Sequence, residues 1–135
     1  MTRGEAPRFR IWVPGKPRSA NGGARSRYRE AIANAARQVI ERPIGSSDVD
    51  IEVWFGSDAM RPDVDNILKP VLDALKGVAY RDDCQVRSVR VVAIPHHRAT
   101  HIPIRAPIEV VQRLGGRDEF LIAIFEGRSL PAGRL

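Results

Sequence analysis

Residues 63–86 read DVDNILKPVLDALKGVAYRDDCQV and contain five of the nine Asp residues of the chain. On a helix over 65–76, at about 100° per residue, the apolar side chains fall on one arc and the polar ones on the other. The apolar set is Ile67, Leu68, Val71, Leu72 and Leu75, and the polar set is Asp65, Asn66, Lys69, Asp73 and Lys76. The pattern predicts a helix that buries one face and ends at Gly77. Because proline lacks an N–H, we expect the regular helix to start one or two residues later, with Pro70 in its first turn.

The residues around this stretch show strand alternation and helical periodicity. The predicted strands are 9–13, 49–55, 86–94 and 120–125, and the predicted helices are 26–42, capped by Ser26, and 107–114. The apolar residues of the strands alternate with polar ones and do not form continuous runs. The order of the predicted strands and helices, together with this alternation, predicts an α+β fold. We expect one domain over residues 1–135, with a mixed β-sheet and helices packed on one face. We expect residues 14–24 to form a basic loop and residues 128–135 a flexible tail.

The net charge of +6 is unevenly distributed along the 135 residues. Residues 1–47 carry 10 basic and 3 acidic side chains, residues 48–83 carry 4 and 9, and residues 84–135 carry 8 and 4. Basic flanks around an acidic segment attract a polyanion and bring its phosphates to a site that repels them unless a cation is bound. The distribution suggests a metal-dependent enzyme acting on a phosphate polymer. The alternative is a generally basic surface that reflects a preference for Arg over Lys.

The single cysteine, Cys84, excludes an intrachain disulfide and a structural zinc site made of cysteines. This composition suits a reducing, cytoplasmic environment, where we expect the protein to act. Residues 1–9 lack the apolar core of a signal peptide, and no segment is long enough to span a bilayer. We therefore expect no membrane partner.

Carboxylates lie at two junctions next to predicted strands. Asp63 and Asp65 lie between a strand and a helix, and Asp82 and Asp83 precede the strand that begins at Val86. We expect the two strand ends to bring these acids to one spot, where a cation relieves their repulsion. Oxygen ligands favour Mg²⁺, which activates water and stabilises charge on a phosphate. The alternative is structural, with the first two acids capping a helix and the last two forming a turn.

Basic and aromatic side chains also have two interpretations. Lys69 either steadies a reacting phosphate or forms an exposed ion pair with Asp65 or Asp73. The residues that we expect to contact phosphates are Lys16, Arg18, Arg25, Arg27, Arg29, Arg61 and Lys76, although solvated charge explains any one of them. Trp12 and Tyr28 have the spacing of core residues, so we expect them to pack and not to stack on bases. His96, His97 and His101 have no acidic partner nearby in the sequence, so we expect no transition-metal site.

The acidic stretch and its flanks resemble the RusA family of Holliday junction resolvases. The residues that carry the resemblance are Arg61-Pro62-Asp63-Val64-Asp65-Asn66, Lys69, Asp73-Ala74-Leu75, Gly77 and Asp82-Asp83-Cys84-Gln85-Val86. It is densest over residues 61–94 and extends more loosely to the first strand, the basic loop and the helix that follows. Residues 95–118 are then an insertion before the last strand.

The resemblance implies a homodimeric endonuclease that cuts four-way DNA junctions by paired nicks and needs Mg²⁺, with Mn²⁺ as a substitute. It implies that Asp63, Asp65 and Asp83 hold the metal and that Lys69 is catalytic, with Asn66 and Asp82 as accessory residues. DNA is then the ligand of the seven basic residues named above, and the products carry a 5′-phosphate and a 3′-hydroxyl. Two alternatives stay open. One is a related nuclease acting on flaps or on phage or defence DNA, and the other is a non-catalytic junction-binding protein.

Overall fold

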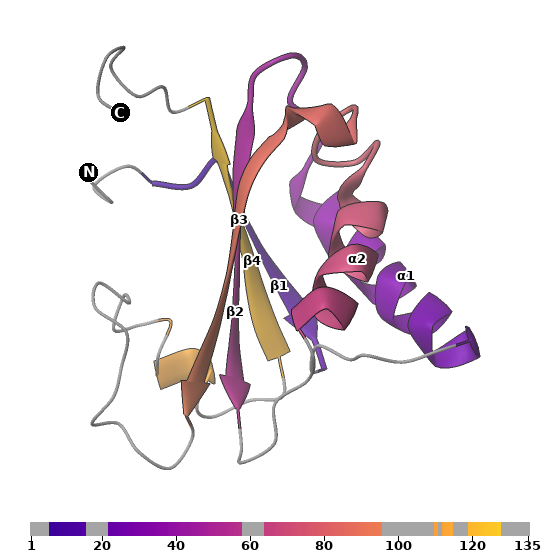
Figure 1. Ribbon diagram of the computed structural model, residues 1–135, viewed down its shortest axis with the longest axis vertical. Helices are drawn as coiled ribbons and strands as arrows, with labels where there is room; N and C mark the ends of the chain where they lie inside the picture. Colours follow the sequence, from indigo (N-terminus) through magenta and orange to yellow (C-terminus); the bar gives the residue numbers. More distant parts are fainter. Residues whose placement is uncertain are drawn as a thin grey trace.

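The computed structural model covers the chain in several segments. It describes residues 6–15, 22–57, 64–95, 110, 112–114 and 119–127, and at 22–25, 57, 64–66 and 95 it describes the backbone alone. These residues form a four-stranded sheet with two long helices against one face (Figure 1). The elements are β1 (Phe9–Pro14), α1 (Gly22–Val39), β2 (Val49–Ser57), α2 (Val64–Leu75), the 3₁₀ turn η1 (Asp83–Gln85), β3 (Val86–Pro95) and β4 (Glu119–Glu126). The predicted α+β fold with a mixed sheet is confirmed.

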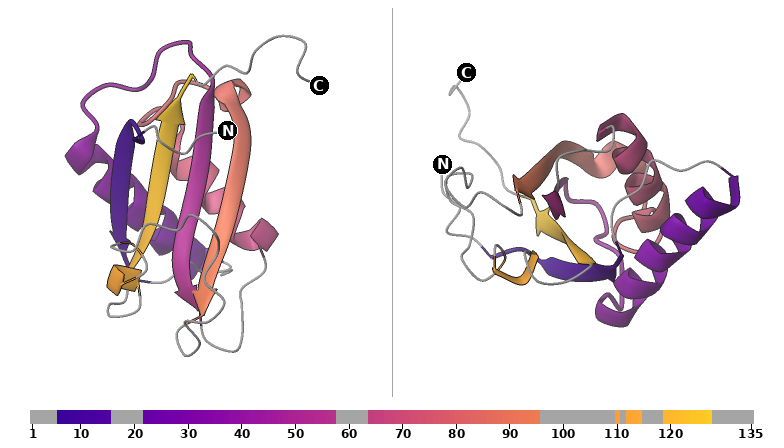
Figure 2. Two further views of the ribbon diagram at one scale, coloured as in Figure 1. Left: turned by 90° about the vertical axis from the view of Figure 1, so that its left-hand side faces the viewer. Right: turned by 90° about the horizontal axis from the view of Figure 1, so that it is seen from below.

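The strand order in the sheet is β1-β4-β2-β3. β4 pairs antiparallel with both β1 and β2, whereas β2 pairs parallel with β3. Val49 lies opposite Val86, and Ser57 lies opposite Pro95. Parallel strands need a long connection, and α2 provides it on the face that α1 also covers (Figure 2). The beginnings of β2 and β3 therefore lie together at one end of the sheet, and their ends lie together at the other.

α2 matches its predicted boundaries to within one residue and ends where glycine predicts. Gly77 has φ +84°, and its N–H donates to the carbonyl of Tyr80 at 2.7 Å, which turns the chain away from the helix. The expectation for Pro70 was wrong, because the helix begins at Val64 and contains the proline in its interior. Pro70 is buried, so burial of its ring offsets the missing backbone hydrogen bond.

α1 begins four residues earlier than predicted and ends three residues earlier. Ser26 lies inside the helix and is exposed, so its predicted role as the cap was wrong. The helical backbone extends upstream through Arg25 and Ala24, which are good helix formers, and includes Gly23 and Gly22. The buried side chains of this region are Tyr28, Ile32, Ala33, Ala36 and Ile40. Their spacing turns one side of α1 to the core, as predicted.

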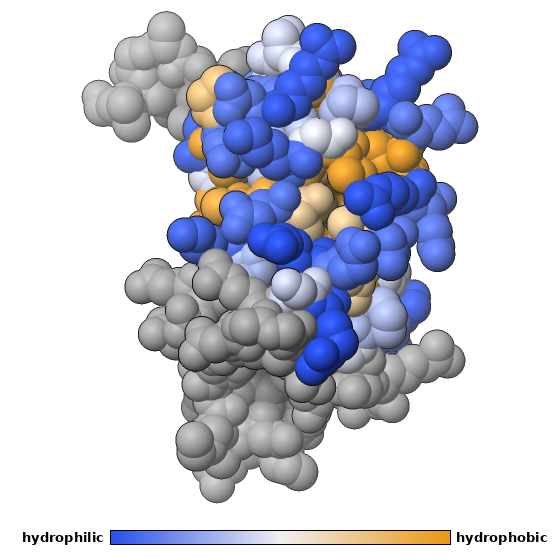
Figure 3. Space-filling view, turned by 90° about the vertical axis from the view of Figure 1, so that its right-hand side faces the viewer, coloured by the Kyte–Doolittle hydropathy of each residue, from blue (hydrophilic) through white to orange (hydrophobic). Residues whose placement is uncertain are grey.

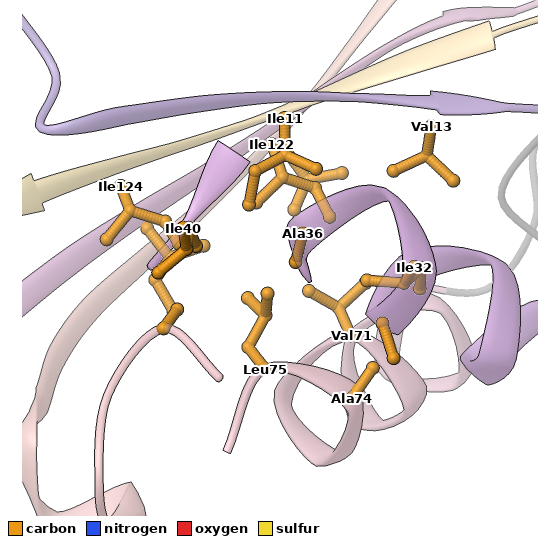
Figure 4. Packing of buried hydrophobic residues seen from close by; sticks show 14 of the residues in the cluster. Ile11, Val13, Ile32, Ala36, Ile40, Val71, Ala74, Leu75, Ile122 and Ile124 are labelled. Atoms are coloured by element: carbon orange, nitrogen blue, oxygen red, sulfur yellow. The ribbon is translucent and has the colours of Figure 1, made fainter. Parts of the chain in front are cut away.

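The larger core fills the space between the two helices and the sheet (Figure 4). In this view, side chains of the sheet face side chains of the helices: Ile11, Val13, Ile122 and Ile124 on one side, and Ile32, Ala36, Val71, Ala74 and Leu75 on the other. Alternate residues of each strand share a face, which is why the alternation in the sequence identified them. Tyr28 belongs to this core, with its ring centroid 5.9 Å from that of Phe120, so its predicted packing role is confirmed.

The opposite face of the sheet carries a second, smaller core. Its buried members are Trp54, Val92, Ile94, Val110, Leu114 and Leu121, with Trp12 packed against them. Val110 and residues 112–114 have helical backbone, which agrees with the helix predicted over 107–114 wherever that segment is described. The guanidinium carbon of Arg113 lies 3.9 Å from the centroid of the Trp12 ring, and Arg113 also pairs with Glu119. The two long helices share one face, as predicted, whereas this short helical segment packs on the other.

An ion pair between the exposed Arg87 and the buried Asp50 joins the beginnings of β2 and β3. The side chain of Asp50 is 5% exposed, and its Oδ2 accepts from Nη2 of Arg87 at 2.8 Å. Its Oδ1 accepts from Nε of Arg87 at 3.3 Å and from the hydroxyl of Ser88. The hydrogen bond to Asp50, followed by the charges of Asp50 and Asp48, raises the pKa of Arg87 against a smaller opposing effect of burial. The ion pair of Arg87 with Asp50 therefore links the start of β3, directly after η1, to the start of β2.

Several predicted features lie outside the described residues. They are the expected tail at 128–135, the three histidines, most of the predicted insertion at 95–118 and most of the basic loop at 14–24. Among the helices that the structure does describe, none has the length and apolar character needed to cross a bilayer.

Candidate active site

The start of α2 and the turn that carries Asp82 and Asp83 lie at opposite ends of the sheet. η1 leads into β3 and therefore lies beside the beginning of β2, whereas α2 follows the end of β2. In Figure 1, α2 begins in the lower half of the view and runs upward, toward the turn that precedes β3. At roughly 1.5 Å per residue, the helix from Asp65 to Leu75 spans about 15 Å. Within one chain, the backbone at the start of α2 and the turn that carries Asp82 and Asp83 are therefore separated, whereas Asp63 and the side chain of Asp65 lie outside the described part of the chain.

Asp82 and Asp83 lie on an exposed turn that one buried side chain holds in place. That side chain is Gln85, which is 7% exposed and has only backbone partners. Its Oε1 accepts from the N–H of Arg81 at 2.8 Å and of Asp82 at 3.0 Å, and its Nε2 donates to the carbonyls of Ile44 at 3.1 Å and Ser47 at 3.0 Å. The amide thus ties the acidic turn to the segment that leads into β2. Both aspartates remain exposed to solvent.

Tyr80 connects the same turn to α2. Its side chain is fully buried, and its hydroxyl donates to the carbonyl of Leu72 at 3.0 Å. Burial, followed by the nearby negative charges of Asp83 and Asp73, raises the pKa of Tyr80 far above its usual range. The phenol therefore stays protonated and keeps its hydrogen bond to α2 at any pH at which the protein works.

Along α2, the exposed row that the periodicity predicted is present. Lys69, Asp73 and Lys76 are exposed, while Ile67, Val71 and Leu75 are fully buried. The ion pairs among the described residues involve neither Lys69 nor Asp73, so the alternative pair between these two is not formed. The side chain of the other predicted partner of Lys69, Asp65, lies outside the described part of the chain.

The other acidic candidates are described in part or not at all. Asp65 and Asn66 lie in the first turn of α2, where the structure describes their backbone. Asp63 and Arg61 lie outside the described residues. The first turn of a helix offers unpaired N–H groups and a positive dipole end, which favour a negatively charged group nearby.

The N-terminal end of α1 lies at the same end of the molecule as the start of α2 (Figure 1), and Arg27 and Arg29 belong to this half of α1. Arg27 and Arg29 are exposed on either side of the buried Tyr28, and no ion pair among the described residues involves them. Figure 3 shows that the described part of the helical side is mostly hydrophilic, with a hydrophobic patch between the charged residues. Lys16 and Arg18 fall outside the described residues, and Arg25 is described by its backbone alone.

The donor chemistry of the described turn suits a hard divalent cation. Asp82 and Asp83 offer adjacent, exposed carboxylates, and Mg²⁺ needs only one or two carboxylates because it keeps several waters and takes phosphate oxygens. No group of three or more His, Cys, Asp or Glu side chains is close enough to hold a metal within the part of the chain that is described. The single thiol in this region, Cys84, is exposed, and a thiolate is not a ligand that Mg²⁺ prefers. The residues present fit Mg²⁺ or Mn²⁺ better than a soft metal.

Gln85 has no predicted role. The signal was present, because Asp82-x-x-Gln85 has the spacing of a capping box, in which the later side chain reaches back to an earlier backbone N–H. The structure contains that hydrogen bond. What the spacing does not indicate is the second pair of contacts, to carbonyls about forty residues earlier in the chain.

A model of the endodeoxyribonuclease RusA family matches residues 15–106, a segment that includes α1, α2, the acidic turn and β3. The match covers more than half of the chain, and the protein therefore belongs to the RusA family of endodeoxyribonucleases. The resemblance inferred from the acidic stretch is confirmed. No curated protein matches the chain.

Proposed function

We propose that this protein is a Mg²⁺-dependent, structure-selective endonuclease that resolves four-way DNA junctions by paired nicks and acts as a homodimer in the cytoplasm. The observation that carries the proposal is the family match over residues 15–106, because it contains the complete acidic stretch. The exposed acidic turn and the exposed Lys69 on α2 support it, since both are accessible to a large substrate.

Each residue of the proposed site has a role that its chemistry allows. Asp63, Asp65 and Asp83 would hold the metal, with Asp82 and Asn66 as accessory residues. When bound, the metal lowers the pKa of water and offsets charge on the reacting phosphate. Lys69 would donate hydrogen bonds to the phosphate oxygens, where it stabilises the negative charge that grows in the transition state.

A second copy of the chain reconciles this set of residues with the fold. Oxygen ligands of one Mg²⁺ lie about 2.1 Å from the ion, whereas α2 separates position 65 from the acidic turn by its whole length of about 15 Å. In a homodimer, the acidic turn of one copy can lie against the start of α2 of the other. Two copies also provide the two sites that paired nicks require.

A comparison of substrates tests the proposed activity. With Mg²⁺, the protein is expected to cut a synthetic four-way junction about tenfold or more faster than a flap or a linear duplex of the same sequence. A chelator is expected to stop cleavage, and Mn²⁺ to restore it. A preference for the flap would favour processing of other DNA structures, and binding without cleavage under either metal would leave only a junction-binding protein.

Arg27 and Arg29 are expected to contact the DNA backbone. Replacing either residue with Ala should weaken junction and duplex binding alike and reduce the slope of log K against log salt by about 1 for each phosphate that the variant no longer neutralises. Arg8→Ala serves as the matched control, because Arg8 is exposed but paired with Glu126 at 3.1 Å. Binding measured by fluorescence anisotropy at several salt concentrations checks this. An equal effect of all three variants would show that only the net charge matters.

A further inference from the structure

We propose that Gln85 is a positioning residue that presents the acidic turn to the metal. The inference rests on the proposed function, because it requires that Asp83, two positions before Gln85, is a metal ligand. Gln85 itself is buried and does not reach the substrate, so it acts through the backbone that carries Asp82 and Asp83.

The contacts of Gln85 divide into two pairs with different consequences. The two N–H groups that Oε1 accepts from belong to Arg81 and Asp82, so they set the shape of the turn. The two carbonyls that Nε2 donates to belong to Ile44 and Ser47, so they set the position of the turn relative to the sheet. An amide is the one side-chain group of this length with both acceptor and paired donors, which is what these four partners need.

Two further contacts hold the chain in place before and after Gln85. Tyr80 connects the preceding residues to α2, and the pair of Arg87 with Asp50 connects the following residues to β2. These anchors hold the ends of the segment, whereas Gln85 holds its middle, next to the carboxylates. Loss of the amide is therefore expected to leave β3 in place and to loosen the acidic turn. Groups that orient a metal ligand in this way commonly change metal affinity by about 10–100-fold when they are removed.

The test measures the metal and the turn separately from catalysis. Gln85→Leu removes all four hydrogen bonds, and Gln85→Asn keeps the amide but shortens it by one methylene, which prevents it from reaching both sets of partners. We expect Gln85→Leu to weaken Mn²⁺ binding to the DNA-free protein about 10–100-fold, measured by electron paramagnetic resonance titration. The Mg²⁺ concentration for half-maximal junction cleavage should rise by a similar factor, with near-normal cleavage recovered at high Mg²⁺.

Cys84 is the only cysteine of the chain, is exposed and lies between Asp83 and Gln85, so its alkylation rate reports on the same turn. Iodoacetamide should modify Gln85→Leu faster than the unsubstituted protein. Leu114→Ala is the control, because Leu114 is 1% exposed in the smaller core on the other face of the sheet. This variant should unfold at a lower urea concentration but keep Mn²⁺ affinity and Cys84 reactivity unchanged.

The outcomes separate this inference from the proposed function. A folded Gln85→Leu with unchanged Mn²⁺ affinity and unchanged Cys84 reactivity overturns the positioning role and leaves Gln85 as a structural residue. If Gln85→Leu does not fold, the same two measurements on Gln85→Asn decide. If Asp83→Asn keeps full Mn²⁺ affinity and cleavage, the proposed site is wrong, whatever Gln85 does to the turn.

Discussion

Asp65→Asn is expected to abolish junction cleavage, by at least about 10²–10³-fold, while junction binding is retained. The substitution keeps the shape of the side chain and removes the negative charge that a divalent cation needs. Because position 65 lies in the first turn of an otherwise well-packed helix, the fold should not change. Single-turnover cleavage and a binding titration in Ca²⁺, measured on the same preparation, check both parts. Undiminished cleavage would refute the assignment of this residue.

Asp83→Asn is expected to cause a loss of the same order, whereas Asp82→Asn should have a smaller effect. The two aspartates are adjacent and exposed on one turn, so each serves as the matched control for the other. An equal loss in both variants would indicate that the two carboxylates share the ion. A loss in Asp82→Asn alone would reverse their assigned roles.

The same two variants test whether the second copy completes the site. Refolding the Asp65→Asn and Asp83→Asn variants together produces mixed dimers. In a mixed dimer, the unchanged Asp65 of one chain can meet the unchanged Asp83 of the other. One site of each mixed dimer is then intact and the other lacks both residues. We expect the mixture to regain single nicks but not paired nicks. A mixture as inactive as its components would place both residues in one chain's own site.

Phe120→Ala is expected to lower the free energy of unfolding by about 3–5 kcal/mol. The ring of Phe120 is completely buried in the larger core and contacts the ring of Tyr28 on α1, so its removal leaves a cavity between the sheet and the helices. Such a loss is a large part of the about 5–15 kcal/mol that stabilises a typical domain. Urea unfolding followed by tryptophan fluorescence measures it.

Val39→Ala is the corresponding control for stability. Val39 is 51% exposed at the end of α1, and a surface substitution of this kind usually changes the free energy of unfolding by less than about 0.5 kcal/mol. A loss for Phe120→Ala as small as the loss for Val39→Ala would show that the region around β4 relaxes and fills the cavity.

The elements and their buried faces could be predicted from the sequence because periodicity is a local property. Of the predicted apolar arc, Ile67, Val71 and Leu75 are fully buried and Leu68 and Leu72 are half-buried, and Gly77 ends the helix with a positive φ. Local signals failed where tertiary packing outweighs them. Pro70 lies inside α2 with its ring buried in the fold, whereas the error at Ser26 was local, because the helical backbone of α1 already begins at Gly22.

The candidate site was predictable in composition but not in geometry. The chain itself determines which acids, lysine and arginines are present, the order of its helices and strands, and its membership of a nuclease family. Tertiary structure alone decides that β3 pairs parallel with β2 and that Gln85 joins the acidic turn to residues 44 and 47. Strand direction and partner choice depend on contacts between residues far apart in the chain, which no local pattern encodes. For this reason the fold separates the start of α2 from the acidic turn, although the sequence places them only eighteen residues apart.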